Sequence, residues 1–197
     1  QLIEKKNFSC LLRYNTNLTN LHQFEKNLID LWKPFEQIEI LASIDGLGRK
    51  GEIIRSGINL AKFESNFRKL KELDQVKIKI APTLSLLNAE ILPNLHRTYV
   101  EKELIKIDEV HFNILDQPYH YNIKSLPKDQ KKQVQTLFEE HINWVASHRG
   151  DASEWKAAIQ YMNQDDWSNR YEKAKQETRR LDELRGEDLE LRIKNEE

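Results

Sequence analysis

Polar side chains follow each of the four apolar, strand-like runs of this sequence. They supply hydroxyl groups, amide groups and two carboxylates, in the order Asn15, Thr16, Asn17, Ser43, Asp45, Thr83, Ser85, Asn113 and Asp116. Ligands of parallel α/β folds bind at the carboxyl ends of the strands, because the loops and the helix N-termini converge there. Neutral hydrogen-bonding groups with two carboxylates suit hydroxyls, amides or an amino acid moiety better than phosphate or metal. Each of these residue types also favours turns and helix caps.

The elements that must position these groups alternate between strand-like and helical patterns. Strand-like runs cover residues 8–14, 38–44, 76–81 and 108–115, with a further extended piece at 119–123. Helical spacing of apolar residues predicts helices from about residue 21 to Pro34, from 59 to 73 and from 88 to 102. After Pro127 only helical patterns remain, the last of them over about 166–184 before Gly186. We therefore predict an α/β fold, with a partial (βα) barrel of parallel strands over residues 1–127 and an all-helical extension over 128–197.

The composition disfavours several classes of partner. The formal charge is −1, from 31 basic and 32 acidic side chains, so no overall field draws the chain to nucleic acid or to anionic lipid. The apolar runs are far shorter than the roughly 20 residues that span a bilayer. The single cysteine, Cys10, excludes an internal disulfide, and we expect a cytoplasmic protein. Because the chain begins with Gln1 and its one methionine is Met162, we also expect it to be a piece of a longer protein.

Several short motifs in this order resemble the core of the radical S-adenosylmethionine (SAM) superfamily. They are Thr16-Asn17 after the first strand, Ser43-Ile44-Asp45-Gly46 after the second and Gly51-Glu52-Ile53-Ile54-Arg55-Ser56-Gly57 at a helix start. Leu87-Asn88, Pro118, Leu126-Pro127 and Thr178-Arg179-Arg180-Leu181-Asp182-Glu183-Leu184-Arg185-Gly186 are similar to the twitch-domain branch of that superfamily. The likeness covers most of residues 11–188.

The resemblance implies a cofactor and a reaction. In the family, the serine that matches Ser43 contacts the ribose or methionine part of SAM, and the arginine that matches Arg55 lies near the methionine carboxylate. Asn17, Asp45 and Thr83 are further candidates for SAM contacts. The complete enzyme would cleave SAM reductively to a 5′-deoxyadenosyl radical, which abstracts hydrogen from an unknown small-molecule or peptide substrate, with electrons from a reductant protein.

The departures from the family are equally specific. The family holds its [4Fe–4S] cluster on a C-x3-C-x2-C loop, and this sequence contains no such loop. The region after Pro127 also lacks the cysteines of an auxiliary cluster, so we describe it as a degenerate twitch-like region. No glycine-rich motif of the kind that some relatives carry is recognisable around Thr83.

Two other functions remain open. One is a non-catalytic binding module derived from the same fold. The other is a partial-barrel enzyme that uses the carboxylates of Asp45 and Asp116. The catalytic residues are not identified, although His111 and His120 flank the fourth strand end and are candidates for acid–base work. The six histidines show no metal-site spacing, so a zinc or iron site is not expected.

Overall fold

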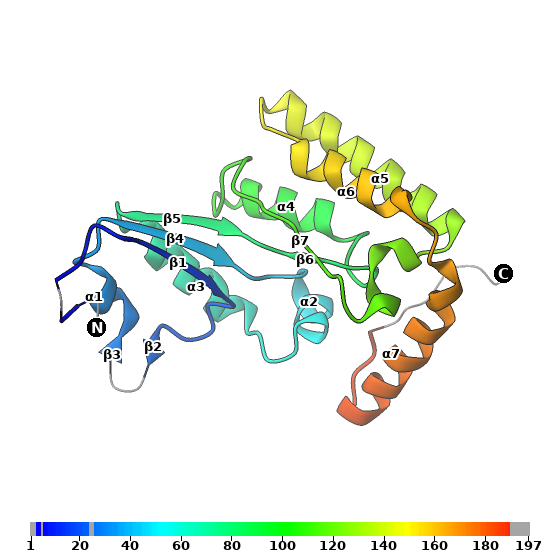
Figure 1. The fold of residues 1–197 in the computed structure, drawn as a ribbon, viewed down its shortest axis with the longest axis horizontal. Coiled ribbons are helices and arrows are strands. Elements are labelled where there is room, and N and C mark those ends of the chain that lie inside the picture. Colours follow the sequence, from blue (N-terminus) through cyan, green and yellow to red (C-terminus); the bar gives the residue numbers. More distant parts are fainter. Residues whose placement is uncertain (1–2, 5, 24–25, 190–197) are drawn as a thin grey trace.

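The computed structural model describes residues 3–4, 6–23 and 26–189. Its largest sheet is parallel and has the order β1-β4-β5, where β1 is Leu11–Thr16, β4 is Gln37–Ala42 and β5 is Val76–Ile80 (Figure 1). Tyr14 pairs with Ile40, and Ile40 pairs with Ile78. The predicted parallel α/β arrangement is therefore present.

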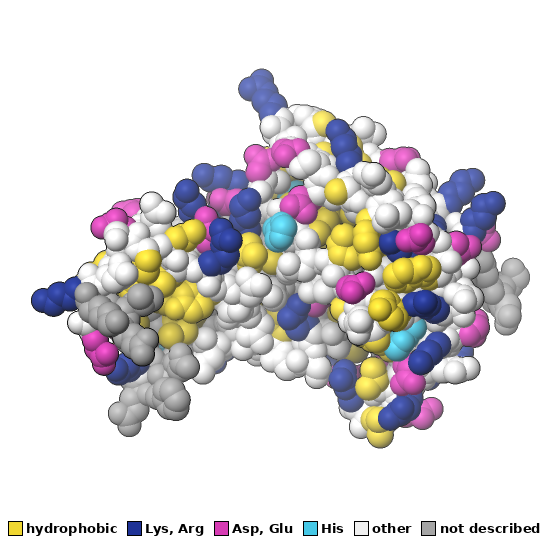
Figure 2. Space-filling model, viewed as in Figure 1, with side chains coloured by type: hydrophobic (Ala, Val, Ile, Leu, Met, Phe, Trp, Pro, Cys, Tyr) yellow, Lys and Arg dark blue, Asp and Glu magenta, His cyan; other side chains and the backbone are white. Residues whose placement is uncertain are grey.

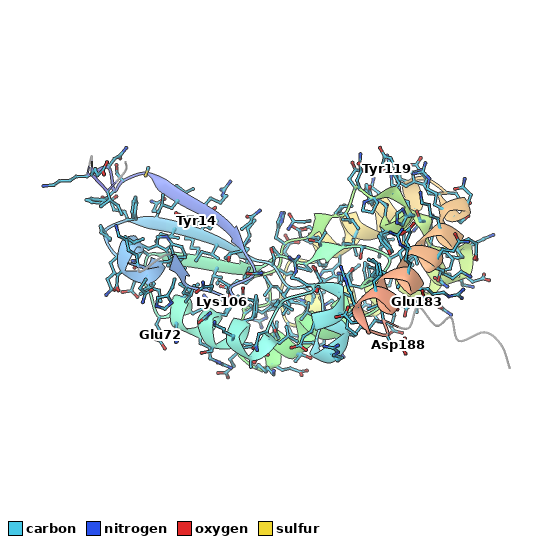
Figure 3. All side chains as sticks on the ribbon, turned by 90° about the horizontal axis from the view of Figure 1, so that it is seen from below. Tyr14, Glu72, Lys106, Tyr119, Glu183 and Asp188 are labelled. Carbon is cyan, nitrogen blue, oxygen red and sulfur yellow. The ribbon has the colours of Figure 1, made fainter. Side chains whose placement is uncertain are left out.

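One face of this sheet is covered by helices, and the other is open. The apolar members of the alternating strands, such as Ile38, Ile78 and Ile80, are buried on the covered face. Helix α3, Leu60–Lys71, packs there through Phe63, Phe67 and Leu70, as its helical spacing predicts. Figure 3 shows the strands as one layer with the helices along one side of it. The polar residues of the same strands therefore face the open side.

The predicted helix from residue 21 to Pro34 is wrong over its first half. The chain forms a hairpin of β2, His22–Gln23, and β3, Lys26–Asn27, and only then the short helix α1, Leu28–Trp32. The side chain of Asn20 accepts a hydrogen bond from the backbone N–H of His22, and Asn27 caps α1 by accepting from Ile29. These local bonds compete with a longer helix. Phe24, which the predicted helix included, lies outside the described residues.

The predicted fourth strand, 108–115, is interrupted. Val110 bridges to Ile80, and β7, Asn113–Ile114, pairs with β6, Thr83–Leu84, in parallel. Between them Pro82 has no N–H to donate, and the N–H of Phe112 donates to Glu154 Oε2 at 3.0 Å instead of to a strand. The segment keeps its strand direction but forms two short pieces.

Several other elements differ from the predicted ones in their bounds or in their type. Residues 46–48 lead directly into helix α2, Gly48–Ile54, and the helix predicted from 88 begins later as α4, Leu92–Glu101, with Pro93 in its first turn. The extended piece predicted at 119–123 is instead two 3₁₀ turns, η1 over Tyr119–Tyr121 and η2 over Ile123–Ser125. The hydroxyl of Ser125 donates to the carbonyl of Tyr119, which closes this compact turn.

Helices form the chain after Pro127, as predicted. They are α5, Lys128–Ser147, α6, Ser153–Gln164, the 3₁₀ turn η3, Ser168–Arg170, and α7, Tyr171–Arg185. Helices α5 and α6 lie side by side, and α7 lies apart from them (Figure 1). Gly186 follows α7 with φ +60°, a left-handed cap that glycine adopts without strain. None of the helices in the described part of the chain is long and apolar enough to cross a bilayer.

The strand region and the helices share one hydrophobic core. Trp155 of α6 is fully buried, with its ring 4.8 Å from that of Phe112 and 5.1 Å from that of Phe138 on α5. Gly150 allows α5 and α6 to approach the sheet side, since a Cβ there would lie 2.6 Å from Ile107 Cγ1. The helical region is therefore packed against the residues that follow β5. The division into two domains at residue 127 stays a prediction.

Candidate ligand site at the strand ends and the open sheet face

Three of the predicted site residues form one clasp at the carboxyl ends of the strands. Asp45, just beyond β4, is buried, and its Oδ2 atom accepts a hydrogen bond from Nε of Arg55 at 2.8 Å and forms an ion pair with Nη2, also at 2.8 Å. Its Oδ1 atom accepts from the backbone N–H of Thr83 at 2.7 Å. Arg55 Nη2 also lies 3.4 Å from Thr83 Oγ1. The clasp ties the ends of β4, α2 and β6 together, and both oxygens of Asp45 are already occupied.

Helix α2 reaches this position because two glycines allow close approach. A Cβ on Gly51 would collide with the carbonyl oxygen of Gly46, and a Cβ on Gly46 would lie 2.7 Å from Ile91 Cδ1. Without side chains, the first turn of α2 lies directly on the loop after β4. The helix then ends at Arg55, whose guanidinium group folds back to Asp45. The glycines therefore position the arginine.

Ser43 lies between the sheet and the clasp. Its backbone N–H donates to the carbonyl of Thr16 at 2.7 Å, which extends the β1–β4 ladder by one residue. Ser43 lies two residues after Leu41 of β4, so strand alternation directs it toward the open face. Asp45 lies two residues further on, beyond the strand. The Ser43 side chain is half-buried, and its hydroxyl has no hydrogen-bond partner within the described ranges. It is free to bind a ligand.

The other predicted strand-end residues have local structural roles. The exposed Asn17 accepts from the N–H and the hydroxyl of Thr19, which makes it a turn residue. Ser85 and Asn88 are buried and bonded to each other, and Asn88 also donates to the carbonyl of Thr83. Asp116 is exposed. The fold brings Asp45, Arg55 and Thr83 together, sets Ser43 beside them, and leaves Asn17 in its turn.

A second feature that sequence reasoning did not single out is a cavity of about 330 Å³ on the open sheet face, with charged side chains in its wall. Its wall carries the side chains of neighbouring strands: Arg13, Glu39, Leu41, Lys77, Lys79 and His111. On the face seen in Figure 2, Lys and Arg side chains gather over these strands beside a histidine. The alternation of Val76-Lys77-Ile78-Lys79-Ile80 was the signal, because it places both lysines opposite the buried isoleucines.

His111 is the candidate acid–base residue that this cavity includes. Its Nδ1 atom lies 2.9 Å from Glu154 Oε1, and Glu154 also accepts from the N–H of Phe112, so the carboxylate is held from two sides. A carboxylate partner at Nδ1 favours the tautomer with its proton there and leaves Nε2 as the basic nitrogen. His120, the other candidate, lies in η1 against the ring of Tyr121, and burial lowers its pKa.

Two further histidines, His96 and His141, are in contact in the interior, although they are 45 residues apart in the sequence. Their environment is apolar and aromatic: the rings of Trp144 and Trp155 lie 5.0 and 4.2 Å from the ring of His141. Burial lowers the pKa of His96 to about 4 and the pKa of His141 to about 3. Neutral rings in such surroundings pack as core residues.

The described residues do not provide a metal centre. They include no group of three or more His, Cys, Asp or Glu side chains arranged to hold an ion. Cys10 is a half-buried thiol whose Sγ atom lies 3.4 Å from the carbonyl of Asn7. A [4Fe–4S] cluster needs several thiolates, so these residues do not fit one.

The structure is that of an α/β protein with a parallel sheet, a polar clasp at its strand ends, which is a candidate ligand site, and a cavity with basic side chains in its wall on the open face of the sheet. No protein-family model matches the chain, and no curated protein and no solved structure matches it significantly.

Proposed function

We propose that this chain is the SAM-binding part of a radical SAM enzyme, and that its parallel sheet is part of a (βα) barrel. The observation that carries the proposal is the Asp45–Arg55–Thr83 clasp at the carboxyl ends of the parallel strands, with Ser43 two residues before Asp45 on the segment that leaves β4. These are the positions that the resemblance assigns to SAM. The open sheet face would then point into the barrel, where a substrate would lie.

The groups at this site fit the polar parts of SAM. Arg55 uses Nε and Nη2 for the clasp, and its Nη1 group has no hydrogen-bond partner in the part of the chain that the structure describes. That group is available to a carboxylate, for which the guanidinium is well suited. The Ser43 hydroxyl both donates and accepts, as ribose hydroxyls and an amino acid group require. Asp45 would act as a positioning residue, since its oxygens hold Arg55 and Thr83.

The cluster is a different case. Reductive cleavage of SAM and hydrogen abstraction from a substrate would depend on a [4Fe–4S] cluster, and one cysteine cannot bind it. We therefore assign no step of the chemistry to these residues. Their proposed work is to bind and orient SAM and to exclude water from it.

The test is a calorimetric titration of the 197-residue chain with SAM. We expect Ser43→Ala and Arg55→Ala each to weaken binding by about 1–3 kcal/mol, because each removes a partner of a polar ligand group. The matched controls are Ser56→Ala and Arg49→Ala, whose exposed side chains lie outside the clasp, and they should bind as the wild type does. The absence of SAM binding by the wild-type chain, or equal affinity in all variants, would contradict the proposal.

A non-catalytic binding module remains a second candidate, and the single cysteine favours it. The coding sequence upstream of Gln1 separates the two functions. An in-frame C-x3-C-x2-C motif there would support the enzyme, and an upstream region without it would support the module. The enzyme built on Asp45 and Asp116 has less support, because Arg55 and Thr83 already occupy the Asp45 carboxylate.

A further inference from the structure

The cavity on the open sheet face is formed by side chains that the strand register places side by side. Arg13, Glu39 and Lys77 are aligned across β1, β4 and β5. The next open-face row pairs Leu41 with Lys79. Val110 is aligned with Ile80 on the covered face, so His111 follows on the open face beside β5. Four strand segments thus contribute to one polar surface.

The charges on this surface do not cancel. Arg13 is neutralised by Glu39, because its Nε and Nη2 atoms lie 2.8 and 2.7 Å from Glu39 Oε2. Among the residues that the structure describes, Lys77 and Lys79 have neither an ion-pair nor a hydrogen-bond partner for their ammonium groups. Glu154 is held by His111 and the N–H of Phe112. Two uncompensated positive charges therefore remain beside the cavity.

The spacing of the two lysines suits a single anion. Alternate residues of a strand lie about 6.6 Å apart on the same face, so both flexible side chains reach the space between them. An anion there would accept hydrogen bonds from two ammonium groups and relieve their mutual repulsion. His111, on the neighbouring segment, adds a third donor when its Nε2 atom is protonated.

We propose that this cavity binds a small molecule through an oxyanion group, either a carboxylate or a phosphate. A cavity of about 330 Å³ has the size of a small-molecule site rather than of a polymer groove. The net charge of −1 argues in the same direction, because it provides no overall field that would attract a polyanion. The identification of the anion as part of the enzyme's substrate rests on the proposed function, whereas the binding site itself does not.

The experiment is a nuclear magnetic resonance titration of the 197-residue chain at constant ionic strength. The probes are inorganic phosphate, succinate and the uncharged succinamide. We expect phosphate or succinate to shift the amide signals of residues 39–41, 77–80 and 111. Shifts with phosphate alone would point to a phosphate ester, and shifts with succinate alone to a carboxylic acid.

The variants are Lys77→Gln and Lys79→Gln, with Lys69→Gln on the exposed side of α3 as the matched control. Each of the first two should weaken anion binding by about two- to fivefold, as expected for exposed charge pairs, and the control should not. Equal weakening by Lys69→Gln, equal binding of succinamide, or no shifts at these residues would overturn the proposal. Since SAM binding is measured separately on Ser43 and Arg55, either proposal can fail without the other.

Discussion

The Nδ1 atom of His96 lies 2.8 Å from the Nε2 atom of His141, between α4 and α5. His96 Nε2 lies 3.1 Å from the carbonyl oxygen of Ile107, which can only accept a hydrogen bond. His96 therefore has its proton on Nε2 and accepts from the protonated Nε2 of His141. Both rings are neutral in the folded chain, as their lowered pKa values require.

This pair predicts a loss of stability in mild acid. The pKa values are about 4 and about 3 when folded, below the 6.5 of a free histidine, so the unfolded chain binds the protons first. The free energy of unfolding should be independent of these two groups above pH 6.5. It should fall by about 1.4 kcal/mol per pH unit and histidine as the pH drops from 6.5 toward 4.

Urea unfolding between pH 7.5 and 4.5 measures this slope. His141→Phe should reduce the slope, and His22→Gln, in the β2 strand, serves as the control. Asp151 and Asp166, whose pKa values are lowered by hydrogen bonds from Ser153 and Ser168, titrate below 3.8 and act outside this window. A wild-type stability that stays constant from pH 7 to 4.5 would contradict the assignment of neutral, buried rings.

The clasp at the strand ends predicts an asymmetry between two ion pairs. Asp45→Asn should lower the free energy of unfolding by about 1–3 kcal/mol, because it weakens a buried carboxylate that accepts two hydrogen bonds and forms an ion pair with Arg55. Glu39→Gln removes the partner of Arg13 on the exposed sheet face and should cost less than about 1 kcal/mol. Thermal and urea unfolding of both variants compare them directly. Equal costs would mean that the clasp is no more than a surface pair.

Gly51 predicts a link between loop packing and ligand binding. Gly51→Ala introduces a Cβ that collides with the Gly46 carbonyl, so α2 must move away from the loop and carry Arg55 with it. Overpacking of this kind costs about 1–3 kcal/mol of stability. We expect weaker SAM binding as well, measured by calorimetry. Ser56→Ala, just beyond α2, is the control, and unchanged binding in Gly51→Ala would show that the arginine position does not depend on this contact.

The buried ion pair of Lys124 and Asp165 predicts that its two members differ in how much their removal destabilises the fold. Its Nζ atom is bonded to Asp165 Oδ2 at 2.6 Å and to Gln164 Oε1 at 3.1 Å, and it lies 4.2 Å from the ring centre of Tyr161. Asp165→Ala leaves this buried ammonium group without its countercharge, whereas Lys124→Met replaces it with an apolar side chain. We expect Asp165→Ala to be the more destabilising change in urea unfolding, since an unpaired buried charge costs more than a removed pair. The opposite order would refute this.

The strands and C-terminal helices were predictable because their apolar spacing agrees with their burial. Ile38 and Ile40, or Ile78 and Ile80, alternate with polar residues as a half-covered sheet requires. The hairpin at 22–27 was not predictable in this way, since Leu21 and Leu28 also fit a helix until the Asn20 and Asn27 side chains bond to the backbone.

The candidate site was likewise predictable only in part. That Asp45 and Thr83 would meet at one sheet edge follows from strand order alone. The capture of Arg55 by Asp45 depends on how closely α2 packs on the loop, which the sequence signals only through Gly46 and Gly51. The contact of His96 with His141 depends on the packing of α4 against α5, for which no short motif exists.

The position of β1 at one end of the strand order has a consequence for the molecule as a whole. In the described part of the chain, β4 is the one strand paired with β1, and the large side chains of Leu11 and Tyr14 are exposed on it. The backbone groups along its other side are open to a further strand. We expect sedimentation of the 197-residue chain to show self-association that grows with concentration.

Leu11→Lys should reduce this association, and Leu184→Lys, at an even more exposed leucine of α7, should not. A monodisperse monomer at high concentration would show that the edge is protected. If the free edge of β1 pairs with further strands, the three-stranded sheet can extend by the addition of strands. Whatever segment completes it in the cell would also decide whether the chain stays in solution as a single molecule.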